Sequence, residues 1–294
     1  MKGFKVQRAI LFVNPRKKNA QALANEIITE LGSLDIKADV FSSKRKSTFE
    51  TKESYDVAIS LGGDGTVLST ARTMSPRKVP VFPINLGTFG FIAGVHPLEW
   101  REVLRQWLKG KSSISRRLML EVTVERGGAK IDMGCCLNEV VISAVGAVKL
   151  ITLEASYCSS GGKNVVKLGQ YRSDGLIVST PTGSTAYSAA AGGPIVDPEL
   201  EAVILNFICP FTLTHRPLVL PMEEMVMIEV DREERKGVLL TIDGQVIEKL
   251  KGGDRIYIKK ASYSCLLVAS GRQGFFQALR TKLAWTGSNV EETP

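Results

Sequence analysis

Residues 57–66 are Val57-Ala58-Ile59-Ser60-Leu61-Gly62-Gly63-Asp64-Gly65-Thr66, an apolar run that leads directly into a glycine-rich loop. The run at 57–61 predicts a buried strand, and residues 66–74 predict a helix. Ligands bind at such strand ends in open parallel sheets. Glycines let backbone N–H groups approach a phosphate chain, and the helix N-terminus adds its positive dipole end. The stretch therefore predicts an α/β domain with a phosphate site on this loop.

Asp64 stands in the middle of the loop, where a carboxylate repels phosphate unless it does chemistry or holds a metal. Two functional roles are open: it takes a proton from an attacking hydroxyl, or it coordinates Mg²⁺. The alternative is an ordinary Asp-Gly turn. The loop has neither the Walker spacing nor the dinucleotide fingerprint. Five matching residues between a strand and a helix favour a functional acid over the turn.

Strand and helix signals alternate on both sides of this loop in residues 1–112. The expected strands are 9–13, 36–41, 57–61 and 79–84, and the expected helices are 20–31, 66–74 and 97–108. Such alternation with short links implies a mostly parallel sheet. We therefore expect residues 1–112 to form an α/β domain that carries the Gly-Gly-Asp-Gly-Thr loop.

The sequence changes in character after residue 112. Short runs rich in Val, Ile and Thr predict strands at 120–125, 140–143, 150–155, 175–179, 225–230, 238–242, 255–259 and 266–268. Only residues 184–191 and 199–206 show helical patterns in this part, and residues 275–285 are helical again. We expect a β-rich domain at 113–270 and a C-terminal tail at 271–294.

The composition restricts the classes of partner. The 294 residues carry a formal net charge of +8 with a pI near 9.2, which suits phosphorylated or other polyanionic partners but is also a common solubility setting. The basic clusters are short and contain no interleaved aromatic residues, so no nucleic-acid platform is expected. No apolar stretch approaches the length of a membrane span.

The cysteines and histidines favour a reduced compartment without a histidine metal site. The five cysteines are an odd number and include no Cys-x-x-Cys pair, which is typical of a cytoplasmic protein. His96 and His215 are the only histidines, too few for a His-built metal centre. The N-terminal apolar run ends in Asn14-Pro15 and predicts a first strand rather than a signal peptide.

Several polar residues of the second half have two interpretations each. Asn138-Glu139 interrupts an apolar stretch, so the pair is either buried with partners or a solvated strand end. Residues 179–188 suit a loop with a Ser184 or Thr185 N-cap, and equally a dinucleotide site. Asp243-Gly244 predicts first a hairpin turn and only second a ligand contact.

Taken together, the motifs resemble the NAD kinase family. Residues 62–66 resemble a signature that NAD kinases share with diacylglycerol-type lipid kinases and phosphofructokinases. Further segments resemble NAD kinases in particular: 85–91, 138–139, 173–188 with 191–194, 216–218 and 243–245. The run at 173–188 is the most specific of these, and lipid kinases lack it. The resemblance extends in order from about residue 9 to residue 280.

The resemblance implies a kinase that transfers a phosphoryl group from ATP (or polyphosphate) to the 2′-hydroxyl of the adenosine ribose of NAD, giving NADP. It implies that Asp64 is the general base and that Mg²⁺ bridges the donor phosphates. Other implied donor-phosphate residues are Gly62, Gly63, Gly65, Thr66 and Arg72, the last on a helix where Ser69 replaces a frequent basic or amide residue. The implied NAD contacts are Asp64, Gly65, Phe91, Asn138, Glu139, Asp174, Thr185, Ala186, Tyr187, Asp243 and Gln245.

Within that set the resemblance assigns Asn138 and Glu139 to adenine and ribose, and Asp174 to the nicotinamide side. It implies a C-terminal helix that returns to the first domain, and a cytoplasmic homodimer or homotetramer whose subunits share NAD sites. Two other functions stay open: a lipid kinase of the diacylglycerol type, and a non-catalytic NAD(P)-binding regulator. Neither a nucleic acid nor a membrane is expected as partner.

Overall fold

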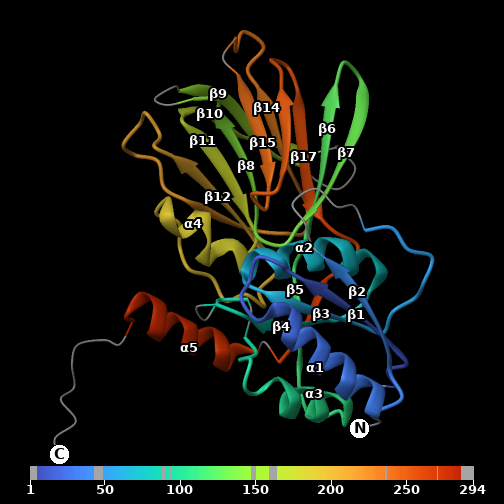
Figure 1. Cartoon of the computed structure of the whole chain (residues 1–294). Coiled ribbons are helices and arrows are strands. Elements are labelled where there is room, and N and C mark those ends of the chain that lie inside the picture. The colour runs from blue at the N-terminus through green and yellow to red at the C-terminus, as the bar shows by residue number, and fades with distance from the viewer. Residues whose placement is uncertain are drawn as a thin grey trace, which may run out of the picture. The chain divides into compact units, whose positions relative to one another are not determined.

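The computed structural model describes residues 5–42, 49–87, 90–92, 94–146, 150–158, 164–235, 237–269 and 271–285. The chain divides into two compact units (Figure 1). Unit 1 comprises Met1–Arg116 and Leu266–Pro294, and unit 2 comprises Arg117–Cys265. The expected limits were 112 and 270, so the unit boundaries fall at somewhat different residues. The last strand of the chain therefore belongs to unit 1, not to the β-rich part as expected.

Unit 1 is built on a six-stranded sheet with strand order β2-β1-β3-β4-β18-β5. Its strands are β1 (Arg8–Val13), β2 (Lys37–Ser42), β3 (Val57–Gly62), β4 (Val81–Asn85), β5 (Ile114–Arg117) and β18 (Cys265–Val268). The pairs β1–β2, β1–β3, β3–β4 and β4–β18 are all parallel. The expected parallel α/β sheet is confirmed, with β5 as an addition.

Helices cover both faces of this sheet (Figure 1). They are α1 (Ala20–Ser33), α2 (Asp64–Met74), α3 (Trp100–Leu108) and α5 (Arg272–Leu283), with a 3₁₀ turn η1 (Ser75–Arg77). One apolar core combines Leu11 of β1, Ile27 of α1 and Trp107 of α3. Alternate residues of each strand point to opposite faces, and Figure 1 shows α2 on the face away from α1 and α3. Thus the links after β1 and β3 leave on opposite sides.

Two helix starts differ from expectation. Helix α2 begins at Asp64, two residues before the expected start, because an acid is favourable in a first turn and Gly63 can take the extended N-cap conformation. Helix α3 begins at Trp100 rather than at residue 97, with residues 97–99 in a turn. The first of these differences changes the site, because it places the Asp64 side chain on a helix instead of a loop.

Unit 2 is a sandwich of two antiparallel sheets. The first has strand order β10-β9-β14-β17-β6-β7 and the second β13-β12-β11-β8-β15-β16. The bounds are β6 (Leu120–Arg126), β7 (Ala129–Cys136), β8 (Glu139–Ala144), β9 (Ile151–Cys158), β10 (Val165–Ser173), β11 (Gly175–Ser179), β12 (Ala202–Ile208), β13 (Leu218–Pro221), β14 (Met225–Val230), β15 (Val238–Ile242), β16 (Val246–Leu250) and β17 (Arg255–Lys260). A single core contains residues of both sheets, such as Val122, Ile228, Ile142 and Leu240, so the sheets pack face to face.

Two helical expectations in unit 2 were wrong. Residues 199–206 lie mostly in β12, whose Val203, Ile204 and Leu205 are buried; a short apolar run does not separate helix from strand by periodicity alone. The expected helix at 184–191 is instead a 3₁₀ turn η2 (Thr182–Thr185) and a short α4 (Tyr187–Ala190). Non-helical backbone at Ala186 (φ −99°, ψ −129°) separates them.

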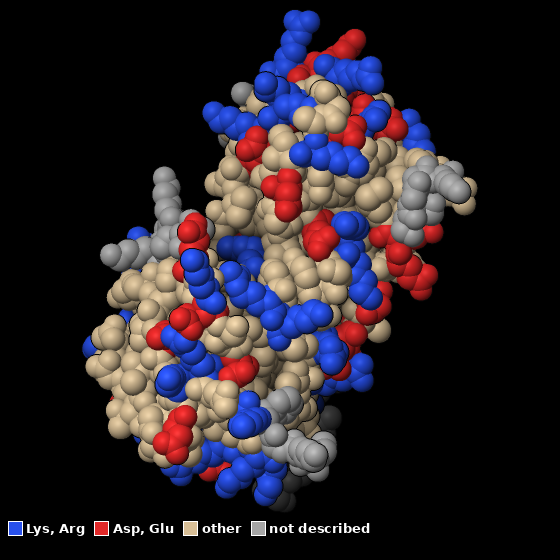
Figure 2. Space-filling view, turned by 90° about the vertical axis from the view of Figure 1, so that its right-hand side faces the viewer, with Lys and Arg blue, Asp and Glu red and all other residues tan. Residues whose placement is uncertain are grey.

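On the face that Figure 2 shows, the surface charge is mixed. Figure 2 shows Lys and Arg side chains spread over the face in view and mixed with Asp and Glu. Of the helices in the described residues, none has the length and apolar character needed to cross a membrane. Of the five free cysteines, all but Cys209 are buried.

Candidate functional site

The first candidate site lies on unit 1, where β1, β3 and β4 end. Their loops are joined by backbone hydrogen bonds: the Asn14 N–H donates to the Leu61 carbonyl (3.0 Å), and the Leu86 N–H donates to the Gly62 carbonyl (2.7 Å). The connections after the adjacent β1 and β3 leave on opposite faces. Such a topological switch point is where open α/β sheets bind ligands.

Asp64 occupies the first turn of α2, with Gly63 as N-cap. Its side chain is partly exposed at the carboxyl edge of the sheet. Gly90, in the loop after β4, packs directly against it: a Cβ built on Gly90 would lie 2.0 Å from Asp64 Oδ1 and 2.7 Å from Cγ. Only a glycine therefore fits beside the carboxylate in this position. Gly90 lies in the segment that suggested the family, but no local pattern indicated that it packs against Asp64.

Gly62 and Thr66 pack together beneath the loop. A Cβ on Gly62 would lie 2.1 Å from Thr66 Oγ1, and Thr66 is only 6% exposed. Gly62 is thus required by the Thr66 side chain, whereas a Cβ on Gly63 would meet no atom within 4 Å. Of the predicted phosphate residues, Gly63 and the exposed Gly65 present backbone at the surface, and Thr66 supports the turn from inside.

Two further residues predicted for the site lie in unit 1: Arg72 lies away from the loop, and Phe91 faces a helix. Arg72 is in the last turn of α2, about 12 Å along the axis from Asp64 at 1.5 Å per residue. The structure therefore does not bring Arg72 to the glycines. The ring of Phe91 lies 6.4 Å from that of Phe275 on α5, and Lys282 Nζ lies 5.3 Å from the Phe91 centroid. The C-terminal helix thus packs beside the segment that follows Gly90.

The second candidate site lies on unit 2, at the sheet edge where β8 begins and β11 and β15 end. Glu139 pairs with Ser179 of β11, and the adjacent Val140 pairs with Ile242 of β15. The Asp243 carboxylate accepts the backbone N–H groups of Leu137 (3.1 Å), Asn138 (2.8 Å) and Glu139 (3.2 Å). Asp243 therefore fixes the backbone that presents Asn138 and Glu139.

The expected hairpin turn at Asp243-Gly244 is confirmed between β15 and β16. Asp243 (φ 47°) and Gly244 (φ 64°) both take the left-handed conformation, and the Gln245 N–H donates to the Ile242 carbonyl (2.9 Å). Asp243 is 5% exposed and its oxygens are occupied by backbone donors. These contacts support the turn first, and both Gly244 and Gln245 of this turn are exposed.

Four buried polar atoms of this part of the sequence in unit 2 have no hydrogen-bond partner within the described residues: Asn138 Oδ1, Glu139 Oε2, Thr182 Oγ1 and Ser188 Oγ. Buried polar atoms are normally paired, so these four are open to a hydrogen bond from a polar ligand or from water. Burial, together with the nearby Asp243 carboxylate as the smaller cause, raises the pKa of Glu139 from 4.5 to about 8. Of the two sequence interpretations of Asn138-Glu139, the structure shows the buried one.

Residues 179–188 wrap around the same edge. Thr180 Oγ1 donates to the Leu137 carbonyl (2.6 Å) and accepts the Gly183 N–H (3.1 Å), which holds the segment against β8. The Ser184 hydroxyl accepts the Val196 N–H (3.1 Å) instead of capping a helix, so the expected N-cap was wrong. Of the residues that follow, Thr185 and Ala186 are partly exposed and Tyr187 is 45% exposed.

Asp174 lies at the opposite end of β11 from this group. Its N–H donates to the Ile208 carbonyl (3.0 Å), and its carbonyl accepts the Ala144 N–H (3.0 Å). At about 3.3 Å per residue, about 16 Å of strand separates Asp174 from Ser179. Within one chain, therefore, Asp174 is not brought together with Asn138 and Glu139.

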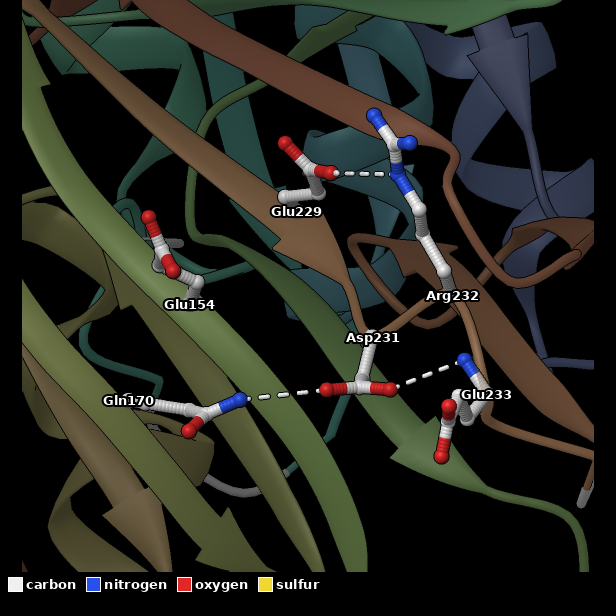
Figure 3. A pocket seen from close by; sticks show the side chains of 6 residues that line it. All are labelled: Glu154, Gln170, Glu229, Asp231, Arg232 and Glu233. Carbon is white, nitrogen blue, oxygen red and sulfur yellow. Dashed lines mark hydrogen bonds and ion pairs between the residues drawn. The ribbon is translucent and has the colours of Figure 1, made fainter.

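A cavity of about 330 Å³ lies elsewhere on unit 2 (Figure 3). It is lined by Glu154, Gln170, Glu229, Asp231, Arg232 and Glu233. Three of its four acids have partners: Glu154 pairs with Lys167 (2.6 Å), Glu229 with Arg255 (2.8 Å) and Asp231 with Gln170 (3.1 Å). Among the described residues no cluster of three or more His, Cys, Asp or Glu could hold a metal ion. None of the residues predicted from the sequence lines this cavity.

Comparison with known proteins finds the same family over both units. The family model of the ATP-NAD kinase N-terminal domain matches residues 5–112, and that of the C-terminal domain matches residues 137–270. An NAD kinase from Treponema denticola is 42% identical over 285 residues, which cover 97% of this chain and 98% of the relative. An NAD kinase from Geobacter sulfurreducens is 43% identical over 230 residues, 78% of each chain.

Solved structures show the same fold. The crystal structure of yeast NADH kinase complexed with NADH superimposes with a TM-score of 0.83 at 23% identity, over 98% of this chain and 90% of that one. An NAD kinase from Archaeoglobus fulgidus in complex with ATP gives a TM-score of 0.72 at 24% identity, over 95% of this chain and 98% of that one. The arrangement of an α/β part with a β-rich part and a C-terminal helix is thus shared.

Proposed function

The chain belongs to the NAD kinase family and catalyses the ATP-dependent phosphorylation of NAD, and we propose that Asp64 is the general base of this reaction. In the proposed mechanism, Asp64 accepts the proton of the 2′-hydroxyl of the adenosine ribose as that oxygen attacks the terminal phosphorus of ATP. The products are NADP and ADP. A positioned base contributes about 10²- to 10⁴-fold to such a step.

The assignment rests on the position of the Asp64 side chain. Its carboxylate is held on the first turn of α2, at the sheet edge where ligands bind, with the Gly90 backbone against it. A fixed carboxylate beside glycine backbone suits a proton acceptor that acts next to a phosphate chain. Phosphoryl transfer depends chiefly on such positioning and on neutralisation of the phosphate charge.

We propose that unit 2 holds NAD through the group at the start of β8. Asn138 Oδ1 and Glu139 Oε2 are buried and without partners among the described residues, so amino and hydroxyl groups of a nucleoside would satisfy them. The exposed ring of Tyr187 is available for stacking on a base. We further propose a homodimer or homotetramer whose subunits share NAD sites. In it, Asp174, at the far end of β11, would contact an NAD molecule that another subunit binds.

Mg²⁺ is part of the proposal as a companion of the donor. Mg²⁺ usually keeps several waters and binds through substrate phosphates with only one or two carboxylates, so we propose that the ATP phosphates hold it here. When bound there, the ion would neutralise charge on the transferred phosphoryl group. We further propose that the protein acts in the cytoplasm, in NADP biosynthesis. Whether polyphosphate replaces ATP as donor is tested by offering each donor alone.

The test is the Asp64→Asn variant of the full chain. Its NADP formation should fall about 10²- to 10⁴-fold in a coupled assay with an NADP-specific dehydrogenase, because an amide accepts no proton. NAD binding, measured separately by calorimetry, should stay within about threefold. Full turnover by Asp64→Asn would remove the assigned role. The same preparation separates the alternatives, since tight NAD binding by the wild-type chain without turnover would indicate a regulator, and phosphate transfer to vesicle-bound diacylglycerol a lipid kinase.

A further inference from the structure

Lys17 lies in the loop after β1, and its ammonium group is turned toward the neighbouring loops. A Cβ built on Gly87, in the loop after β4, would lie 3.1 Å from Lys17 Nζ. The same point is 3.7 Å from Asn85 Oδ1, whose amide oxygen accepts the Gly87 N–H (2.9 Å). The Lys17 ammonium thus lies close to Gly87 after β4, although Lys17 belongs to the loop that follows β1.

The strand order determines what lies under this side chain. In the sheet, β3 stands between β1 and β4. Neighbouring strands are about 4.8 Å apart, so β1 and β4 are about 10 Å apart. A side chain that starts after β1 and ends beside Gly87 must therefore cross the carboxyl end of β3. That end is Gly62, whose carbonyl binds the Leu86 N–H (2.7 Å).

The neighbours of Lys17 in sequence behave differently. Arg16 and Lys18 are exposed, whereas Lys17 is half-buried. Within the part of the chain that the structure describes, Lys17 forms no ion pair with a carboxylate. An ammonium group held beside these loops without a carboxylate partner is available to form a charge-assisted hydrogen bond with an anion that binds there.

We propose that Lys17 binds the phosphate chain of the donor nucleotide at the carboxyl end of β3. This inference rests on the proposed kinase function. The ammonium supplies a cation at the topological switch point, beside Gly63 and the N-terminus of α2. Arg72 lies at the other end of that helix. Lys17 then neutralises donor phosphate while Asp64 serves the acceptor hydroxyl.

The test compares three variants of the full chain. Lys17→Met keeps the aliphatic stem and removes the charge, Lys17→Arg keeps a cation, and Lys18→Met is the matched control on the exposed neighbour. Loss of a charge-assisted contact to phosphate should raise the KM for ATP about 10- to 100-fold in Lys17→Met and leave the KM for NAD within about threefold. Lys17→Arg should recover most of the affinity, and Lys18→Met should stay within about twofold of wild type.

Binding without turnover separates this inference from the kinase function itself. Inorganic tripolyphosphate, offered in competition with a fluorescent ATP analogue and without NAD, should bind Lys17→Met about 10- to 100-fold more weakly than wild type. Equal tripolyphosphate affinity in wild type and Lys17→Met, or equal losses in Lys17→Met and Lys18→Met, would overturn the role of Lys17. A wild-type chain that binds tripolyphosphate through Lys17 but phosphorylates no NAD would instead overturn the proposed function alone.

Discussion

Replacement of Gly90 by alanine should disable Asp64 without touching the substrate directly. The added Cβ would lie 2.0 Å from Asp64 Oδ1, and ordinary van der Waals contact begins at 3.4 Å. The carboxylate or the loop after β4 must therefore move by about 1.4 Å. Misplacement of a catalytic group by about 1 Å costs about 10²-fold in rate. We expect kcat to fall about 100-fold in Gly90→Ala, with the KM for NAD changed by less than about threefold.

The assay is steady-state NADP formation at saturating ATP, with a double-mutant cycle as the decisive comparison. If Gly90 acts by positioning Asp64, Gly90→Ala should lower the residual rate of Asp64→Asn by less than about threefold, because the base is already lost. Gly32→Ala is the matched control: Gly32 is exposed on α1, and a Cβ there meets nothing within 4 Å. This control should keep its kcat and gain about 0.5–1 kcal/mol of stability from helix propensity.

Two results would refute the positioning role. The first is a Gly90→Ala enzyme that retains kcat within about threefold, which would show that the carboxylate tolerates the displacement. The second is a loss in Gly90→Ala that adds in full to that of Asp64→Asn, which would place the damage elsewhere in the loop. A thermal unfolding curve of each variant, compared with Gly32→Ala, separates a local displacement from loss of the fold.

Two further predictions concern unit 2. Because the pKa of Glu139 is raised to about 8 in the folded protein, its contribution to stability is fully present below its unfolded pKa near 4.5 and is lost as the pH rises through about 8. In Glu139→Gln, the free energy of unfolding in urea should therefore change less with pH between pH 5 and 9, by up to about 5 kcal/mol. Parallel pH dependences in wild type and Glu139→Gln would contradict a buried carboxyl group at this position. Asp243→Ala should lower the free energy of unfolding by about 2–4 kcal/mol, because three buried N–H groups lose their acceptor. Asp243→Asn keeps one acceptor oxygen and the left-handed conformation, so its loss of stability should be clearly smaller. Equal losses in the two variants would contradict a stabilising role of these hydrogen bonds.

Some parts of this protein were determined by sequence alone. The apolar run at 57–61 and the glycines after it predict a strand, a turn and a helix because local hydrophobic periodicity and glycine conformation act over a few residues. The same applies to the hairpin at Asp243-Gly244, where two left-handed residues between apolar runs specify the turn. Motifs of this local kind also carried the family resemblance, and through it the function.

Other parts were decided only by the tertiary structure. Residues 202–208 are a strand and not a helix because they pair with β11 and β13, and a short apolar run does not contain that choice. Residues 266–268 join unit 1 because their strand, β18, pairs with β4, far away in sequence. The packing of Gly90 against Asp64 and the position of Lys17 over the end of β3 both depend on the strand order. This order brings together loops that no local sequence pattern connects.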